Sequence, residues 1–155
     1  MNAAVMFSSA SDEWATPQVL FDGLDVEFRF GLDAAASEAN AKCTAFFTRE
    51  DDALTRDWYP GRGWSVWLNP PYSQCAAFIA KASEEANHSG QAVVCLVPSR
   101  TDTRWWHRYV WDAERHRPRA GVEVRFLPGR LKFGDSKNSA PFPSVVIVFR
   151  PQGAA

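Results

Sequence analysis

Short apolar runs alternate with amphipathic stretches along this chain, and this pattern predicts a series of strands and helices. Runs typical of strands occupy residues 26–32, 44–48, 65–68, 92–97, 122–127, 131–133 and 144–149. Helical patterns cover residues 75–88, which Ser89 and Gly90 should end, and about 103–114. A short helix should also follow Thr16 and Pro17, with Val19, Leu20 and Leu24 on its inner face.

Strands that alternate with helices, and then follow one another directly, indicate an α/β fold. Residues 92–97 are apolar throughout, as in a strand that is covered on both faces. We expect one Rossmann-like domain of reduced size over residues 13–151, with a mostly parallel sheet and an antiparallel edge strand. Residues 1–12 should be a disordered N-terminus and residues 152–155 a tail. In such sheets, ligands bind beyond the carboxyl ends of the strands.

Composition narrows the class of protein. The 155 residues are 46% hydrophobic, which suits one buried core. Because the chain lacks both a long apolar run and the pattern of a signal peptide, we expect a soluble, cytoplasmic protein that does not bind membranes. Three scattered cysteines and three histidines have no ligand spacing, so no metal site is predicted.

Charge is distributed unevenly along the chain. Residues 1–99 contain 6 Lys and Arg against 13 Asp and Glu, whereas residues 100–155 contain 11 against 5. The basic segment could bind a polyanion, although an ordinary solvated surface with uneven charge explains the counts about equally well.

The segment Asn69-Pro70-Pro71-Tyr72 follows an apolar strand and precedes a helix, where a ligand site is expected. Its residue types suit transfer of a group to the exocyclic amine of adenine. The lone pair of that nitrogen is delocalised into the ring until both of its N–H groups are held by acceptors. The Asn69 side-chain oxygen and the Pro70 carbonyl can supply two acceptors, and the paired prolines restrict the backbone.

Tyr72 can serve as a stacking surface for a base that has left the duplex. The alternative is that all four residues merely form a turn, since each type is common in loops. The position after a buried strand and the order of the residues favour the catalytic interpretation.

The chain resembles the phage-type DNA N-6-adenine methyltransferases, which depend on S-adenosylmethionine, and the resemblance covers nearly its whole length. It rests on a series of short segments in a fixed order. These segments are residues 14–17, 32–37, 47–54, 57–58, 69–72, 97–101, 129–133 and 143–144.

This resemblance implies a Rossmann-like methyltransferase domain that takes S-adenosylmethionine as its cofactor. The residues that it places around the cofactor are Trp14, Thr16, Pro17, Asp33, Phe47 and Asp52. Asp52 would accept a hydrogen bond from the cofactor's adenine amine, and Asp51 or Glu50 are alternatives for that role. Ala34–Ala36 stand where the broader class has a glycine-rich turn, and they either leave room for a ligand or pack a helix start.

Double-stranded DNA is the expected partner. The residues expected to contact it are Arg100, Arg104, Trp105, Arg130 and Lys132. For Trp105 and its neighbours the more favoured interpretation is an amphipathic helix, because Trp106, Tyr109 and Val110 fall on one face. Target specificity should either be short or lax, or come from loops, from a homodimer or from a partner chain.

Two other functions compete with DNA adenine methylation. The same catalytic motif also serves methylation of RNA bases and of glutamine amides, although the basic C-terminal segment disfavours a protein substrate. The second is a catalytically inactive nucleic-acid-binding module with the same fold.

Overall fold

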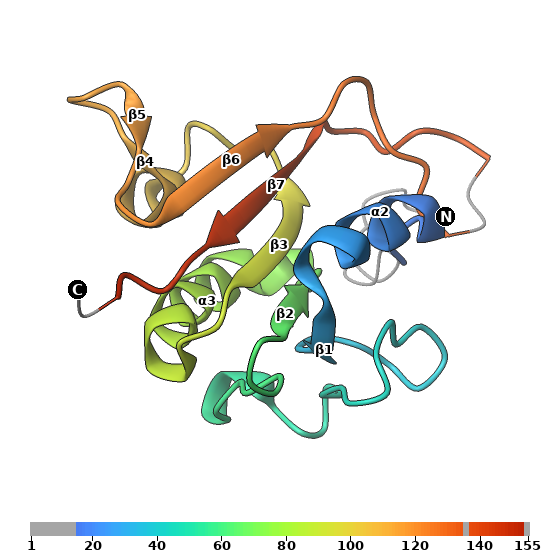
Figure 1. The fold of residues 1–155 in the computed structure, drawn as a ribbon. Coiled ribbons are helices and arrows are strands. Elements are labelled where there is room, and N and C mark those ends of the chain that lie inside the picture. Colours follow the sequence, from blue (N-terminus) through green and yellow to red (C-terminus); the bar gives the residue numbers. More distant parts are fainter. Residues whose placement is uncertain (1–14, 135–136, 154–155) are drawn as a thin grey trace.

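The computed structural model describes residues 15–134 and 137–153, in which five strands form the main sheet (Figure 1). In spatial order the strands are β1 (Phe30–Asp33), β2 (Ser65–Leu68), β3 (Val93–Pro98), β7 (Ser144–Phe149) and β6 (Val122–Phe126). The first three are parallel, and β7 is antiparallel to both of its neighbours, so four of the five strands run in one direction. The predicted α/β class is confirmed, with the reversed strand one place in from the edge. Nowhere in the described residues is a helix both long and apolar enough to cross a bilayer.

Helix α3 (Cys75–Ser89) covers one face of the sheet. Its residues Phe78, Ile79 and Ala82 are buried, as the sequence predicted, and they pack with alternate strand residues in a single cluster. The helix ends where Gly90 adopts the left-handed conformation, with φ of 73°. Glycine has no Cβ to oppose this conformation, so the predicted stop at this position is confirmed.

Helix α2 (Gln18–Phe28) covers the opposite face through Phe21 and Leu24, which are buried. The ring of Phe21 meets that of Trp67 at 5.4 Å in an edge-on arrangement. The prediction that Val19 faces inward is wrong, because this side chain is 86% exposed. The face of the helix that packs against the sheet instead contains Phe21 and Leu24.

The predicted strand at residues 26–32 is wrong in its first half, because α2 continues to Phe28. Arg29 then adopts a left-handed conformation with φ of 57°, and β1 begins at Phe30. The carboxylate of Asp25 accepts the N–H of Phe30 at 2.8 Å, so the turn closes on the last turn of the helix. Apolar residues on both sides of Arg29 fit a helix face as well as a strand, which made this run ambiguous.

Residues 44–48 form a single bridge rather than the predicted strand. The backbone of Asp33 donates to the carbonyl of Ala45 at 3.0 Å and accepts the N–H of Phe47 at 2.9 Å. These two bonds hold the segment that follows β1 around the carboxyl end of that strand.

The predicted strand at residues 131–133 is wrong, because the connection between β6 and β7 is irregular where it is described. Its Leu131 carbonyl accepts the N–H of Ala140 at 2.7 Å. Phe133 and Phe142 are buried in the hydrophobic cluster that contains Phe21 and Leu24 of α2, called the α2-side core below. The N–H of Gly134 donates to the Ala15 carbonyl at 2.9 Å. The connection thus reaches the segment that precedes α2.

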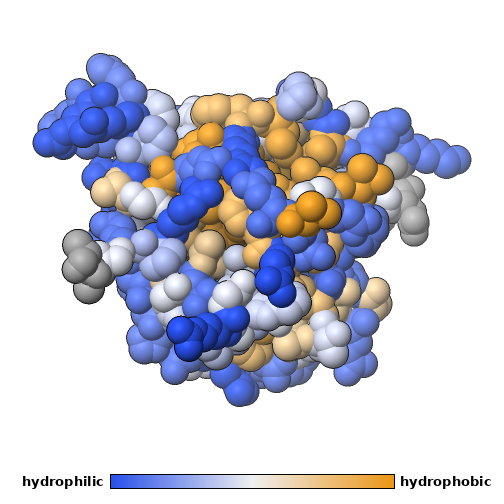
Figure 2. Space-filling view, viewed as in Figure 1, coloured by the Kyte–Doolittle hydropathy of each residue, from blue (hydrophilic) through white to orange (hydrophobic). Residues whose placement is uncertain are grey.

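The predicted helix at residues 103–114 ends early, in the π-helix η3 (Trp106–Val110). The strands β4 (Trp111–Asp112) and β5 (Arg117–Pro118) follow as a hairpin that projects from the domain (Figure 1). The carboxylate of Asp112 accepts two backbone N–H groups in the hairpin turn, at 3.1 Å each, which favours a turn over a continued helix. The surface of this hairpin is largely hydrophilic (Figure 2).

The helical face predicted for this region is confirmed. Trp106 and Val110 are buried. Tyr109 is partly buried and packs against the hydrophobic cluster that contains Phe78 and Ile79 of α3, called the α3-side core below. Trp105 is half-buried against the same core, with its ring 5.9 Å from that of Trp106.

Candidate active site

A cavity of about 430 Å³ opens at the carboxyl ends of β1 and β2. Its wall is built from four separate parts of the chain: residues before α2, after β1, around η1 (Ala53–Thr55), and from β2 to the start of α3. This volume lies within the range of about 300–1,000 Å³ that is typical of small-molecule sites. The cavity therefore lies where a parallel sheet is expected to bind its ligand.

The structure brings together residues from the predicted catalytic loop and the predicted cofactor site. Those that line the cavity are Thr16, Asp33, Asp52, Asn69 and Pro71. Ala34, Ala35 and Ala36 also line it, so the three alanines leave room at the cavity wall.

Several predicted residues lie beside the cavity without lining it. Phe47 packs against the α3-side core, and Tyr72 packs against the α2-side core. Pro17 and Pro70 are chain neighbours of the lining residues Thr16 and Asn69. Trp14 lies outside the described residues.

The side chain of Asn69 is oriented by Thr16. The Asn69 Nδ2 atom donates a hydrogen bond of 3.0 Å to the Thr16 Oγ1 atom, across 53 positions of sequence. Thr16 is only 5% exposed, so this bond is shielded from water. Because the amide nitrogen is directed to Thr16, the side-chain oxygen of Asn69 is presented in the opposite direction.

The rest of the loop is held by a short helical turn and by an aromatic contact. Pro71 precedes η2 (Tyr72–Gln74), and its carbonyl accepts the N–H of Gln74 at 3.0 Å. The rings of Tyr72 and Phe142 meet edge to face, with 5.2 Å between their centroids. Burial raises the pKa of the Tyr72 hydroxyl well above its usual range, so this group stays neutral.

Asp33 is a buried carboxylate at the carboxyl end of β1, with 3% of its surface exposed. Its Oδ1 atom accepts the N–H of Ala35 at 3.3 Å, and its Oδ2 atom accepts the N–H of Lys42 at 3.0 Å. Loss of solvation outweighs these bonds and raises the pKa of Asp33 to about 6. A positively charged group bound in the cavity would favour the ionised form of this side chain.

The structure distinguishes the three neighbouring acids that the sequence left as alternatives. The Asp51 carboxylate accepts both the N–H and the hydroxyl of Thr48, at 2.8 and 3.0 Å, and these bonds lower its pKa. Glu50 is exposed and Asp52 lines the cavity. Asp52 has φ of 54°, a left-handed conformation that costs most residues other than glycine about 1–2 kcal/mol and that Asp tolerates better than most.

Sequence reasoning missed several residues of the cavity wall. They are Asn40, Lys42, Arg49, Ser73, Gln74 and Phe78. Asn40 and Lys42 belong to a segment without a recognisable motif, and Arg49 lies in a segment that the resemblance includes but to which it gives no role for Arg49. Both segments reach the cavity because Asp33 pairs with Ala45 and Phe47. One local signal was available, since the Asn40 side chain accepts the N–H of Ser37 at 2.7 Å in a turn that its residue types favour.

The basic residues predicted to contact DNA are exposed, and most follow strands that end at the cavity's edge of the sheet. Arg100 follows β3, and Arg130 and Lys132 follow β6, which runs in the same direction. Arg104 is exposed just before η3. Contact with DNA stays a prediction, which this placement favours.

A group of possible metal ligands lies away from the cavity. Asp57, Glu85 and His88 each offer one ligand atom, and these atoms lie within 4.8 Å of one another. Glu85 already accepts the N–H of Trp58 at 2.6 Å and pairs with Lys81 at 3.5 Å. The buried Glu85 carboxylate therefore serves to hold the backbone of the core residue Trp58.

Comparison with known proteins gives consistent matches. A family model described as DNA N-6-adenine-methyltransferase (Dam) matches residues 4–154. The DNA N-6-adenine-methyltransferase of Haemophilus phage HP1 (strain HP1c1) is 30% identical over 146 residues, which are 93% of this chain and 82% of that protein.

Two further relatives match over shorter stretches. The DNA N-6-adenine-methyltransferase of Escherichia phage T1 is 40% identical over 96 residues, 61% of this chain but only 39% of that protein. A putative methyltransferase YfdM of Escherichia coli (strain K12) is 41% identical over 66 residues, 39% of this chain and 71% of that protein.

Proposed function

Because the chain belongs to the DNA N-6-adenine-methyltransferase (Dam) family, we propose that it transfers a methyl group from S-adenosylmethionine to the N6 amine of an adenine flipped out of duplex DNA. One observation carries this proposal. Asn69, which Thr16 holds in a fixed orientation, lines a cavity that also contains a buried carboxylate. An acceptor for the amine of the base thus lies beside a site for a charged small molecule.

The residues of the cavity fit S-adenosylmethionine in size and charge. The volume of about 430 Å³ suits a cofactor of this class, and the alanines after Asp33 keep the wall open. The charged lining residues are Asp33, Lys42, Arg49 and Asp52, two of each sign. A ligand that carries a sulfonium, an ammonium and a carboxylate needs partners of both signs, and Asp33 is the buried anion for its positive part.

The cofactor supplies an electrophilic methyl group, and the protein's task is to present the amine. We infer that the Asn69 oxygen and the Pro70 carbonyl accept the two N–H groups, so that the lone pair of N6 points at the methyl carbon. The new N–C bond forms as the C–S bond breaks, and the electron pair of the C–S bond stays on sulfur. The methylated nitrogen is then cationic and loses one proton to solvent, so no protein base is required.

Tyr72 is the proposed stacking surface for the flipped adenine. Tyr72→Ala should lower kcat/KM on duplex DNA by about 5- to 160-fold, because stacking contributes about 1–3 kcal/mol per base. Tyr72→Phe keeps the ring and should retain most of the activity. Steady-state methylation assays on both variants test this prediction, and equal losses in the two would show that the hydroxyl, rather than the ring, is what matters.

The acceptor is tested by supplying labelled S-adenosylmethionine with duplex DNA, single-stranded DNA, RNA or a glutamine-containing protein, and then identifying the modified product. Label in N6-methyladenine from duplex DNA supports the proposal. Label in RNA or in protein would reassign the substrate. Absence of label from every acceptor, with the protein folded, would favour an inactive binding module.

A further inference from the structure

The wall of the cavity includes two basic residues, Lys42 and Arg49, to which the sequence had assigned no role. They belong to different parts of the wall. Arg49 lies in the turn beside Asp52, whereas Lys42 lies in the segment that follows β1. A ligand with one carboxylate would therefore meet a cation at either of two places.

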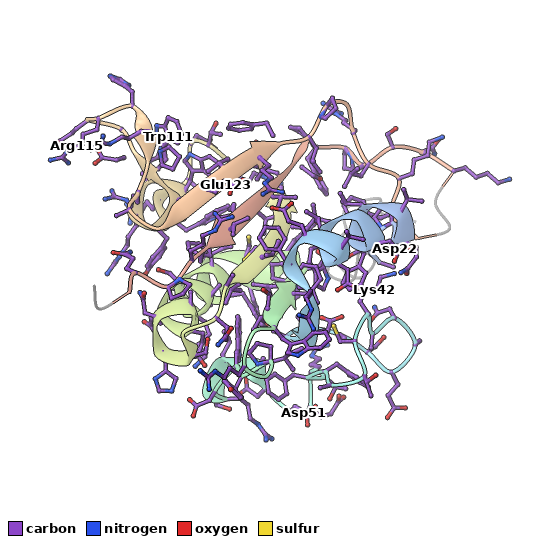
Figure 3. All side chains as sticks on the ribbon, in the orientation of Figure 1. Asp22, Lys42, Asp51, Trp111, Arg115 and Glu123 are labelled. Carbon is purple, nitrogen blue, oxygen red and sulfur yellow. The ribbon has the colours of Figure 1, made fainter. Side chains whose placement is uncertain are left out.

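Lys42 is hydrogen-bonded to Asp33 and to the start of α2. Its backbone N–H donates to Asp33 at 3.0 Å, and its Nζ atom donates to the Gln18 Oε1 atom at 2.6 Å. Gln18 is the first residue of α2 and follows Thr16 by two positions, and Thr16 is the partner of Asn69. Figure 3 shows Lys42 below α2, on the side where Asp22 lies.

The partner that holds the Lys42 ammonium is neutral. The amide of Gln18 is itself oriented, because its Nε2 atom donates to the Asp22 carboxylate at 2.7 Å. Among the described residues, no carboxylate lies within ion-pair distance of Lys42 Nζ. The side chain is thus fixed in place, and its charge, which acts on Asp33 only from beyond ion-pair distance, remains available to an anion in the cavity.

The roles proposed for Asp52 and Asn69 set the direction of the cofactor in the cavity. The transferred methyl group is attached to the sulfur, which also joins the adenosine part to the amino-acid part. If the methyl group faces Asn69 and the adenosine part extends towards Asp52, the amino-acid part extends towards Asp33 and Lys42. We propose that the Lys42 ammonium binds the α-carboxylate of the cofactor, an inference that rests on the proposed function.

Two ligands that differ only in the amino-acid part test this assignment. S-adenosylhomocysteine carries the α-carboxylate, and 5′-methylthioadenosine has the adenosine and thioether without the amino-acid part. Calorimetric titration of Lys42→Met should show about 10- to 100-fold weaker binding of S-adenosylhomocysteine, the range for loss of a charge-assisted hydrogen bond. Binding of 5′-methylthioadenosine should stay within twofold of wild type, which also shows that the variant is folded.

Arg49→Met is the matched control, because it removes the other cation of the cavity. It should change the affinities for the two ligands by the same factor, and Lys42→Arg should recover part of the lost affinity. Equal effects of Lys42→Met on both ligands, or none on S-adenosylhomocysteine, would overturn the assignment. A wild-type protein that binds neither ligand would instead contradict the proposed function.

Discussion

Asn69→Ala is expected to slow methyl transfer to duplex DNA by about 100- to 1,000-fold, the range for loss of one positioned group that acts in the transition state. The variant keeps the cavity wall around Asp33 and Asp52, so S-adenosylhomocysteine should bind within a few-fold of wild type. Loss of the hydrogen bond to the buried Thr16 hydroxyl should lower the free energy of unfolding by about 1–3 kcal/mol. Single-turnover methylation, calorimetry and thermal unfolding measure these three effects separately.

Asn87→Ala is the matched control for this substitution. Asn87 lies on α3 away from the cavity, where its side chain accepts the N–H of Gln152 at 2.8 Å. It should leave the rate of methyl transfer unchanged. If Asn69→Ala kept the wild-type single-turnover rate, the assigned role of the loop would be wrong.

Asp33→Asn is expected to weaken binding of S-adenosylmethionine by about 10- to 100-fold at pH 8, because a buried carboxylate that faces a cation is replaced by a neutral amide. The side chain keeps its size. The pKa of Asp33 is raised to about 6 by burial, so in the free protein this carboxylate becomes protonated as the pH falls through that value. Wild-type affinity should then decrease by up to about tenfold per pH unit below 6, whereas the variant should show little change.

The raised pKa of Asp33 also predicts how the stability of the cofactor-free protein depends on pH. The folded-state pKa of about 6 exceeds the reference value of 3.8, so the folded protein binds this proton more tightly than the unfolded chain does. The stability from protonation of Asp33 is fully present below pH 3.8 and is lost as the pH rises through about 6, on the order of 3 kcal/mol in all.

Denaturant titrations of wild type and Asp33→Asn from pH 4 to pH 8 isolate this contribution, because the other groups titrate in both proteins. Their difference in unfolding free energy should move in favour of Asp33→Asn as the pH rises. A pH-independent difference, together with unchanged cofactor affinity in the variant, would show that Asp33 does not face the bound cation.

The helices and strands that could be predicted from sequence have a clear pattern of apolar residues and clear residues at their ends. The strands β2 and β7 have the predicted bounds, and β3 is displaced by one residue. Each is an apolar run whose buried faces leave little ambiguity. Helix α3 was also predicted, because its apolar spacing is helical and Gly90 ends it.

The errors arose where local pattern and tertiary packing disagree. The apolar residues around Arg29 suit both a helix and a strand. The left-handed turn at Arg29 that separates the two is closed by hydrogen bonds to Asp25, which the apolar pattern does not reveal. The Asp112 side chain stops a helix that the apolar pattern would extend, through hydrogen bonds that residue spacing does not reveal.

The candidate site divides in the same way. Asn69 could be predicted because it directly follows a strand, where parallel sheets bind ligands. Asp33, which ends β1, was placed at the cofactor only by the resemblance to the adenine methyltransferases. Lys42 could not be predicted, because its position depends on a bridge between residues 33 and 46 and on the start of α2. The resemblance placed Asp52 at the cofactor with Asp51 and Glu50 as alternatives, and the hydrogen bonds of Asp51 to Thr48, which favour Asp52, could not be read from the sequence.

The central claim is that the protein methylates adenine in DNA and that the Asn69 loop holds the adenine amine. It is tested most directly by sequencing, with detection of N6-methyladenine, of plasmid DNA from a host that lacks adenine methylation and expresses the wild-type protein or Asn69→Ala. We predict N6-methyladenine in a defined sequence context with the wild-type protein, and none above background with the variant. Unmodified adenine in both samples, with both proteins present and folded, or equal modification in the two, would contradict the account.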